Sequence, residues 1–210
     1  MSQAVPTDRS ETKLRILDAA ERIFARDGFD AASLRTITAD AHANLAAVNY
    51  HFQTKEALFA AAIGRRVGPV NERRLKLLEA ALPERSVHAI LDAFVRPAME
   101  ASLAGASIRP LMARMSGVPD EMMLRIFREY LEPVLNRFVA ELARVLPLIP
   151  EDELRLRMLF VVGSMAHTMG WASVAPDGRD TKNLTERLVA FATSGLNAPF
   201  AKETKQRKQK

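Results

Sequence analysis

Hydrophobic residues recur every three or four positions through most of this chain, which is the period of an amphipathic α-helix. The spacing first predicts a helix over residues 10–27. Its apolar face would consist of Leu14, Leu17, Ala20, Ile23 and Phe24. Gly28 follows, and glycine commonly ends helices, so we expect the helix to stop there and Phe29 to fold back onto it.

Two short helices and a tight turn are predicted next. Ser33 and Asn44 each precede a short apolar stretch, and Thr54 precedes a longer one. Their side-chain oxygens can cap helix N-termini, so we predict helices over residues 34–41 and 45–51 and a long helix after Thr54. Helices this short need tertiary packing to be stable. The core expected for this unit consists of Phe24, Ile37, Val48 and Phe52.

The rest of the chain keeps the helical spacing and lacks the alternation that indicates strands. Gly68-Pro69 is a candidate interruption of the long helix, although we expect a continuous element across residues 64–71. Other prolines suggest an end near Pro97 and a kink at Pro133. The further helices expected cover residues 87–97, 108–115, 119–146, 151–174 and 184–196. We therefore predict an all-α fold. Its parts are an N-terminal three-helix helix-turn-helix domain (10–56), a larger C-terminal helical domain (57–198) and a disordered basic tail (199–210).

The composition is that of a globular protein and excludes chemistry that depends on cysteine. Hydrophobic residues make up 48% and charged residues 26% of the 210-residue chain, which is a globular balance. The absence of cysteine excludes disulfides, thiolate nucleophiles and thiolate metal sites. The net charge is +5, but residues 202–210 hold five basic and one acidic side chain and so supply four of these charges. Bulk charge therefore does not identify a nucleic-acid surface.

Residues 158–175 form a weakly charged run of 18 residues, which approaches the length of a membrane span. Gly163, Ser164, His167 and Thr168 interrupt this run, so we expect a buried interface helix instead. The N-terminus has no apolar core of the kind found in secretory signals. We expect a cytoplasmic protein that does not bind membranes.

Motifs of the common enzyme classes are missing. The sequence has no phosphate-binding glycine loop, no Gly-x-Ser-x-Gly elbow and no pair of histidines at metal-ligand spacing. The scattered histidines are His42, His51, His88 and His167. We therefore expect neither enzymatic activity nor a cofactor or metal.

The region between Phe24 and Leu58 carries a specific motif. Its parts are FARDGF at residues 24–29, Ser33, Ile37, Ala41, YHF at residues 50–52 and KEAL at residues 55–58. Together they resemble the DNA-binding segment of TetR-type transcriptional regulators. The resemblance is close over residues 10–64 and rests elsewhere on length and helical layout. It implies a dimeric regulator that places its second short helix in the major groove of a palindromic operator.

The resemblance also implies roles for individual residues. Ser33 and Arg35 would contact phosphates. Tyr50, His51 and Lys55 would fix the second short helix on the DNA backbone. The positions that would face base edges or nearby phosphates are Leu45, Ala46, Ala47 and Asn49. Among these side chains only the Asn49 amide can form a bidentate hydrogen bond to a base such as adenine. We therefore expect part of the specificity to come from methyl contacts and DNA shape.

Two departures from the family pattern bear on this interpretation. His42 occupies a turn position where glycine is usual, and a left-handed backbone there costs histidine more than glycine. The recognition helix is also unusually apolar. An alternative interpretation therefore stays open, namely a helical protein-interaction module with a non-functional helix-turn-helix.

The C-terminal helices resemble those through which TetR-type regulators dimerise as a four-helix bundle. Small residues permit close helix crossing, and a dimer would engage two half-sites. The expected interface residues are Gly163, Ala166, His167, Gly170, Leu188 and Phe191. For His167 a hydrogen-bonded interface role is favoured over contact with a ligand.

Eight of the nine methionines lie between Met99 and Met169. Such a cluster is compatible with ordinary core filling or with an adaptable apolar pocket. The pocket expected consists of Phe94, Met112, Met115, Met123, Phe127, Tyr130 and Met165. By resemblance its ligand would be a small apolar or amphipathic effector, such as a fatty-acid or acyl compound, that releases DNA. Arg114 and Arg128 are candidates for contact with an acidic headgroup, although surface positions are favoured for both.

Overall fold

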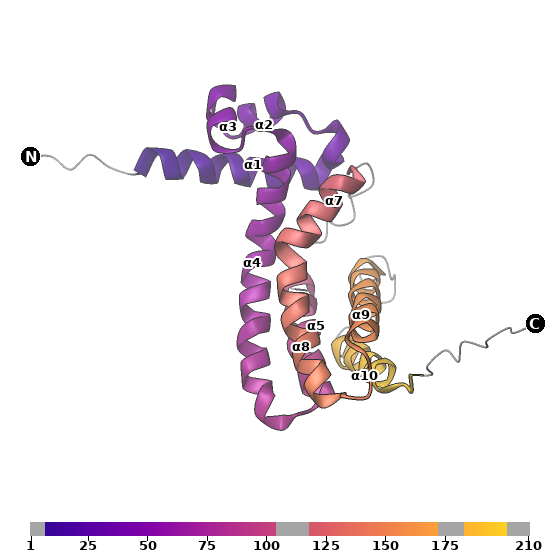
Figure 1. Cartoon of the computed structure of the whole chain (residues 1–210). Coiled ribbons are helices and arrows are strands. Elements are labelled where there is room, and N and C mark those ends of the chain that lie inside the picture. The colour runs from indigo at the N-terminus through magenta and orange to yellow at the C-terminus, as the bar shows by residue number, and fades with distance from the viewer. Residues whose placement is uncertain (1–6, 104–117, 172–182, 201–210) are drawn as a thin grey trace, which may run out of the picture.

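A computed structural model of the protein describes residues 7–103, 118–171 and 183–200. Within these ranges every regular element is helical, as Figure 1 shows, and the predicted all-α fold is confirmed. The elements are α1 (Thr7–Ala31), α2 (Leu34–Asp40), α3 (Leu45–His51), α4 (Lys55–Ala81), the 3-10 turn η1 (Leu82–Glu84), α5 (Val87–Leu103), α7 (Asp120–Ile126), the π-helical turn η2 (Phe127–Leu131), α8 (Glu132–Val145), α9 (Glu151–Trp171) and α10 (Leu184–Asn197). The helix predicted over residues 108–115 lies outside the described ranges.

Helix α1 is interrupted where the sequence predicted its end. Gly28 has φ 84° and ψ 173°, and Phe29 beyond it stacks on Phe24 with ring centroids 6.1 Å apart. The prediction that Leu14 belongs to the buried face is wrong, because this side chain is 50% exposed and Ile16 is fully buried. The buried face of α1 contains Ile16, Ala19 and Ala20, and Leu14 lies outside this face.

The N-terminal helices share one apolar core. The four side chains predicted to meet in it, Phe24, Ile37, Val48 and Phe52, are all buried in this cluster. Leu58, Phe59 and Ile63 of α4 and Met122 and Ile126 of α7 complete it. The domain boundary predicted after residue 56 therefore falls within the first turn of α4, and this helix contributes to both parts of the molecule.

Prolines interrupt the helices less than predicted. Helix α4 is continuous across Gly68-Pro69, because the exposed Pro69 leaves a carbonyl on the side of the helix that water can reach. Helix α5 likewise continues past Pro97 to Leu103. The irregularity expected at Pro133 lies just upstream, in the π-helical turn Phe127–Leu131, and Pro133 itself sits in the first turn of α8, where proline is tolerated.

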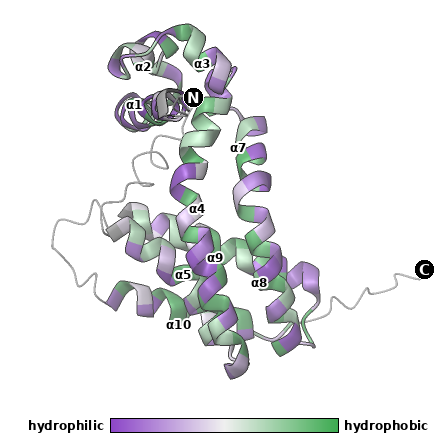
Figure 2. Cartoon of the chain, turned by 90° about the vertical axis from the view of Figure 1, so that its left-hand side faces the viewer, coloured by the Kyte–Doolittle hydropathy of each residue, from purple (hydrophilic) through white to green (hydrophobic). Residues whose placement is uncertain are grey.

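A second apolar core joins the lower half of α4 to α5, α8, α9 and α10. The rings of Phe94 and Phe138 meet edge to face in it, with centroids 5.0 Å apart. Figure 2 shows hydrophobic and hydrophilic residues alternating along these helices, as expected for elements buried on one face only. In the described part of the chain no helix combines the length and apolarity needed to cross a membrane.

Candidate DNA-binding surface and effector cavity

The helix-turn-helix is built from three side-chain caps. Ser33 Oγ accepts a hydrogen bond from Thr36 N (3.0 Å) at the start of α2. Asn44 Oδ1 accepts one from Ala47 N (2.8 Å) at α3, and Thr54 Oγ1 accepts one from Ala57 N (3.1 Å) at α4. All three predicted N-caps are confirmed. They fix where each short helix begins and thus the direction in which α3 points.

The turn between α2 and α3 contains the predicted left-handed residue. His42 has φ 48°, and Ala43 N donates to Thr38 O at 2.9 Å to close the turn. A second left-handed residue, Gln53 with φ 67°, follows α3 and was not predicted. Gln53 follows the C-cap residue of α3, and its N–H donates to Asn49 O (3.2 Å), which is the hydrogen bond of a left-handed helix C-terminus.

Helix α3 exposes the residues that the family resemblance assigned to DNA. Leu45 is 51% and Tyr50 is 68% exposed, whereas Val48 on the opposite side is fully buried. Ser33, Arg35, Ala46 and Asn49 are also exposed, and Ala47, His51 and Lys55 are partly buried. The surface is thus available for a groove, and the contacts with DNA remain a prediction.

Helix α1 adds two basic side chains to this surface that sequence reasoning missed. The Arg9 guanidinium lies 5.8 Å from the centroid of the Tyr50 ring, and Lys13 Nζ lies 6.0 Å from that of Phe52. Their spacing of four residues places both on one side of α1, but only the packing of α3 against α1 shows that this side borders the recognition helix.

Lys55 has a structural contact in addition to its predicted role. Its ammonium donates to Asp30 O (3.3 Å) and lies 4.5 Å from the centroid of the Phe29 ring. This ties the first turn of α4 to the end of α1. An ammonium has three N–H bonds, so a phosphate contact is compatible with this geometry.

An ion-pair cluster joins the DNA-binding unit to α4. Glu21 of α1 is only 5% exposed and forms a short ion pair with Arg66. Arg65 Nε lies 3.5 Å from the same carboxylate, and Arg65 also pairs with Asp18 at 2.5 Å. The cluster fixes the angle between α1 and α4, and α4 continues from there into the C-terminal domain.

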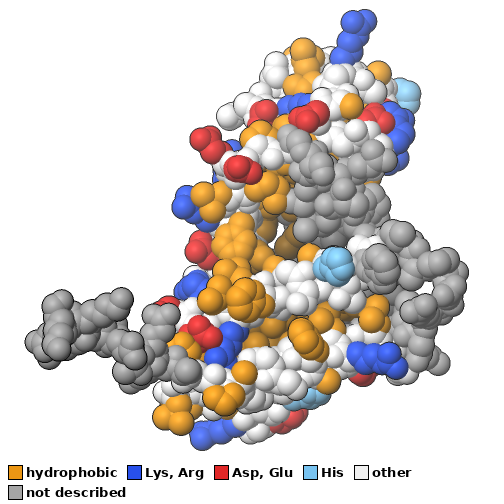
Figure 3. All heavy atoms as spheres, turned by 90° about the vertical axis from the view of Figure 1, so that its right-hand side faces the viewer, with side chains coloured by type: hydrophobic (Ala, Val, Ile, Leu, Met, Phe, Trp, Pro, Cys, Tyr) orange, Lys and Arg blue, Asp and Glu red, His pale blue; other side chains and the backbone are white. Residues whose placement is uncertain are grey.

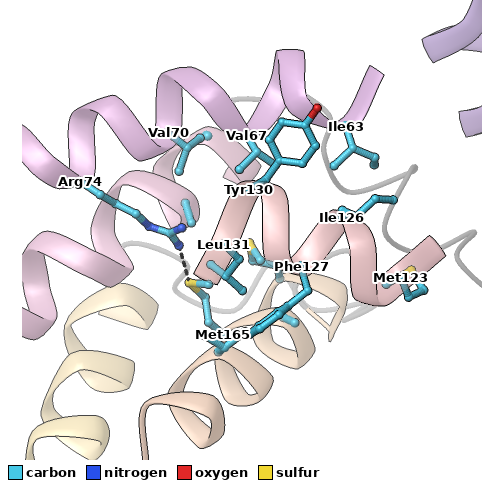
Figure 4. A pocket seen from close by; sticks show the side chains of 15 residues that line it. Ile63, Val67, Val70, Arg74, Met123, Ile126, Phe127, Tyr130, Leu131 and Met165 are labelled. Atoms are coloured by element: carbon cyan, nitrogen blue, oxygen red, sulfur yellow. Dashed lines mark hydrogen bonds between the residues drawn. The ribbon is translucent and has the colours of Figure 1, made fainter. Parts of the chain in front are cut away.

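An apolar cavity of about 270 Å³ lies between α4, α5, α7, η2 and α9, and Figure 4 shows the side chains that line it, ten of them labelled. Its described walls are Ile63, Val67, Val70 and Arg74 of α4; Ala98 and Ala101 of α5; Met123, Ile126, Phe127, Tyr130 and Leu131 of α7 and η2; and Val162, Met165, Ala166 and Met169 of α9. Four predicted pocket residues, Met123, Phe127, Tyr130 and Met165, thus line it. Their contact with an effector remains a prediction.

Other pocket predictions differ from the structure. Phe94 does not line the cavity but is fully buried behind it, between Phe138 and the guanidinium of Arg74, which lies 4.2 Å from its ring centroid. Met112 and Met115 lie outside the described residues, as does Arg114. Arg128 is exposed in η2 and does not line the cavity.

Arg74 is the charged group of the described cavity wall, and sequence reasoning missed it. Its side chain is 3% exposed. Nε donates to Phe94 O (2.8 Å), Nη1 donates to Asn71 Oδ1 (3.0 Å) and Nη2 lies 3.6 Å from Met165 Sδ, the dashed contact in Figure 4. Burial lowers the pKa of Arg74 to about 10. The group is therefore a cation at neutral pH.

Tyr130 borders the same cavity from the π-helical turn. Its carbonyl accepts a hydrogen bond from Asn71 Nδ2 at 2.6 Å, so Asn71 bridges it to Arg74. Burial, together with a hydrogen bond to Glu129, raises the pKa of the Tyr130 hydroxyl to about 12. π-Helical turns are frequent at functional sites, and this one forms the wall opposite α4.

The outer face of α9 and α10 carries an apolar surface (Figure 3). Leu156, Leu159, Phe160 and Phe191 are 45%, 38%, 63% and 69% exposed on it. Of the predicted interface residues, Gly163, His167 and Phe191 are exposed here, and Gly170 is partly buried. Ala166 instead lines the apolar cavity, and Leu188 is buried in the second core although it borders the shallow groove between α9 and α10.

Arg157 fixes α10 on α9. Its side chain is buried, and Nη1 donates to the carbonyls of Leu196 (3.0 Å) and Ala198 (2.6 Å) at the end of α10. Nε pairs with Glu153 at 2.7 Å. The orphan carbonyls of a helix C-terminus are thereby satisfied, and the outer surface of the two helices is held in one arrangement.

A capped helix-turn-helix on a larger helical domain defines the class of a DNA-binding transcriptional regulator. The family comparisons agree with this class in both halves. The model described as "Bacterial regulatory proteins, tetR family" matches residues 16–62, and the one described as "Tetracyclin repressor-like, C-terminal domain" matches residues 92–195. The chain belongs to the TetR family of transcriptional regulators.

Individual proteins show the same relationship. The HTH-type transcriptional repressor Rv3405c of Mycobacterium tuberculosis is 28% identical over 87% of this chain and 83% of its own length. The nicotine-responsive transcriptional repressor HdnoR of Paenarthrobacter nicotinovorans is 33% identical over 40% of this chain, a match that spans 44% of that repressor. The fold of the regulator FadR of Bacillus subtilis, solved with stearoyl-CoA, is similar with a TM-score of 0.68 and 20% identity, over 87% of this chain and 98% of that one.

Proposed function

We propose that this protein is a ligand-responsive repressor that binds a palindromic operator as a homodimer and is released from it by a small apolar or amphipathic effector. The observation that carries the proposal is the course of α4, one continuous helix that begins at the DNA-binding surface and ends in the second core. Ile63 of this helix belongs to the first core and also lines the cavity. A ligand bound in the cavity would therefore contact a side chain of the core that holds the DNA-binding helices.

DNA would be held by α3 in the major groove. Asn49, exposed on α3, would form the direct hydrogen bonds to a base, and Leu45 would offer methyl contact to thymine. Arg35, Tyr50 and Lys55 would contact phosphates and set the register of the helix. Two such helices in a dimer would bind half-sites about one helical turn apart.

The dimer would form through the outer surface of α9 and α10. Leu159, Phe160 and Phe191 expose apolar area there that a second copy of the chain would cover. Gly163 at the same surface permits close approach of a partner helix. Covering this surface in a symmetric contact would fix the distance between the two recognition helices.

The effector would enter the cavity between α4, η2 and α9. Among the described residues its walls are apolar apart from Arg74 and the Tyr130 hydroxyl, which favours an apolar or amphipathic compound. FadR of Bacillus subtilis was solved with stearoyl-CoA and HdnoR is named as nicotine-responsive, so related folds accept different ligands. For this protein we propose an effector of the acyl type. The protein would act in the cytoplasm, where its operator lies.

A gel-shift assay with the DNA that flanks its own gene tests the proposal. We expect a complex that weakens with salt, because phosphate contacts dominate affinity, and that is lost in Tyr50→Ala combined with Lys55→Ala. Lys55 also contacts Asp30, so circular dichroism must show an intact fold, and Arg35→Ala serves as a second phosphate variant. Native mass spectrometry of the purified protein would detect an apolar compound that co-purifies.

The alternative function is a helical interaction module whose helix-turn-helix does not bind DNA. The observation in its favour is the apolar surface of α3, where Leu45 and Ala46 are exposed and Asn49 supplies the single amide. A folded dimer that binds no DNA above its nonspecific level would support this alternative.

A further inference from the structure

Arg74 carries a buried positive charge that no acidic side chain in the described residues neutralises. Its hydrogen-bond partners are a carbonyl, an amide and a thioether, all of them neutral. The ion pairs of its neighbours are separate, since Arg73 pairs with Glu100 at 2.6 Å on the exposed side of α4. A buried charge without a counter-charge is costly, and such groups concentrate at functional sites.

The guanidinium also has unused hydrogen-bonding capacity. It carries five N–H bonds, and the three contacts above engage one on each nitrogen. The remaining two, on Nη1 and Nη2, have no acceptor among the described residues. They belong to the two terminal nitrogens of the fork, which together match the two oxygens of a carboxylate.

Figure 4 places this charge at one end of the apolar cavity. Arg74 reaches in from α4 toward Met165, while Met123 and Ile126 line the far end and Tyr130 the side between. A ligand with one charged end and an apolar body would match this distribution. The cavity of about 270 Å³ lies at the lower limit of usual ligand pockets, roughly 300–1,000 Å³, so a compact body is favoured over a very long chain.

We propose that the effector is a monoanionic carboxylic acid with a compact apolar body, and that its carboxylate pairs with Arg74. The assignment rests on the proposed function, because it names the ligand of the same cavity. One guanidinium balances one negative charge, so a doubly charged phosphate would leave excess charge in an apolar site. Asn71, which contacts both Arg74 and the Tyr130 carbonyl, would position the guanidinium and connect the bound acid to the π-helical turn.

Headgroup-matched ligands test the inference on the full chain. Calorimetric titrations near neutral pH would compare fatty acids from hexanoate to dodecanoate with the alcohol and the amine of equal length. Short aromatic acids such as phenylbutyrate form a second arm that distinguishes an aliphatic from an aromatic body. We expect one or more acids to bind about 10- to 100-fold more tightly than the matched alcohol, and the amine to be weakest.

The variants Arg74→Met and Arg73→Met distinguish the loss of the charge in the cavity from a general effect of replacing an arginine on α4. Arg74→Met should bring acid and alcohol to the same affinity while the alcohol still binds, and Arg73→Met should keep the preference for the acid. The inference is overturned if wild-type protein binds acids no better than alcohols, if no acid in either arm binds, or if Arg74→Met keeps the preference. In each of these cases the gel-shift assay still decides whether the protein is a DNA-binding repressor.

Discussion

Tyr130 covers Gly64 so closely that a side chain at position 64 would displace the Tyr130 ring. A Cβ built on Gly64 would stand 2.6 Å from the Tyr130 hydroxyl oxygen and as close to its ring carbons. Gly64 lies one residue before the pair Arg65 and Arg66, which hold α1 through Glu21. The ring that borders the effector cavity is therefore in direct contact with the segment of α4 that positions the DNA-binding unit.

The first prediction concerns this contact. Gly64→Ala should displace the Tyr130 ring and lower the free energy of unfolding by about 1–3 kcal/mol, as overpacking does. Gly68→Ala on the same helix is the control, because a Cβ there meets nothing within 4 Å. That change should instead stabilise by about 0.5–1 kcal/mol through helix propensity. Urea denaturation measures both.

A double variant decides whether the ring is the cause. In a Tyr130→Ala background the cost of Gly64→Ala should disappear, which gives a coupling energy of about 1–3 kcal/mol in a double-mutant cycle. Equal costs of Gly64→Ala with and without the ring would contradict the contact.

The second prediction concerns the link between α1 and α4. Glu21→Gln leaves Arg65 and Arg66 without a buried counter-charge and should lower the free energy of unfolding by about 1–3 kcal/mol. Asp18→Asn removes a carboxylate that is 45% exposed and should cost less than about 1 kcal/mol. Chemical denaturation compares the two variants. Equal losses of unfolding free energy would show that the burial of Glu21 does not strengthen its ion pairs.

The third prediction concerns the stability of the ligand-free protein. Burial lowers the pKa of Arg74 from the usual value of arginine to about 10, so below that pH its charged form is less favourable in the folded than in the unfolded state. The cost is fully present at neutral pH and is relieved as the pH rises above about 10 toward the usual pKa of arginine. Arg74→Met should therefore leave the free energy of unfolding near neutral pH unchanged or raise it by up to about 3 kcal/mol.

The matched control for this prediction is Arg73→Met, whose side chain is 53% exposed and which should change stability by no more than about 0.5 kcal/mol. Denaturation without added ligand measures both variants. If Arg74→Met is clearly less stable than wild type, the hydrogen bonds of the guanidinium outweigh its desolvation and Arg74 is a structural residue.

The fourth prediction concerns the dimer. Phe160→Glu or Phe191→Glu places a charge in the apolar surface of α9 and α10 and should yield a monomer with unchanged helix content. Leu148→Glu is the control, because this leucine is 92% exposed outside that surface. Light scattering after size exclusion gives the mass. A dimer that survives both phenylalanine changes would place the interface elsewhere.

Local chemistry made the N-terminal unit predictable. Ser33, Asn44 and Thr54 cap helices through hydrogen bonds to residues three positions further on, so their sequence context is sufficient. The conformation of Gln53 was not predicted, because the left-handed residue after a helix is usually glycine or asparagine and glutamine gives no such signal. Leu14 was misplaced because the buried face of α1 also includes Ile16 and Ala19, which place the centre of that face away from Leu14.

The cavity was only partly predictable. Met123, Phe127 and Met165 were expected from composition and spacing, whereas Phe94 is equally apolar and faces the core behind Arg74. Arg74 itself left a signal, since it follows Val67 at the spacing of two helical turns and so lies on the apolar face of α4. A basic residue on such a face indicates a buried charge, but only the structure shows that no described carboxylate meets it.

In the proposed function, α3 binds a specific DNA sequence. The direct test is selection of full-length protein against a pool of random DNA, followed by sequencing, with Asn49→Ala in parallel. We predict a palindromic consensus for the wild type, and for the variant a loss of about 1–3 kcal/mol in affinity with relaxed preference at one base per half-site. A folded wild-type dimer that enriches no sequence would contradict the claim.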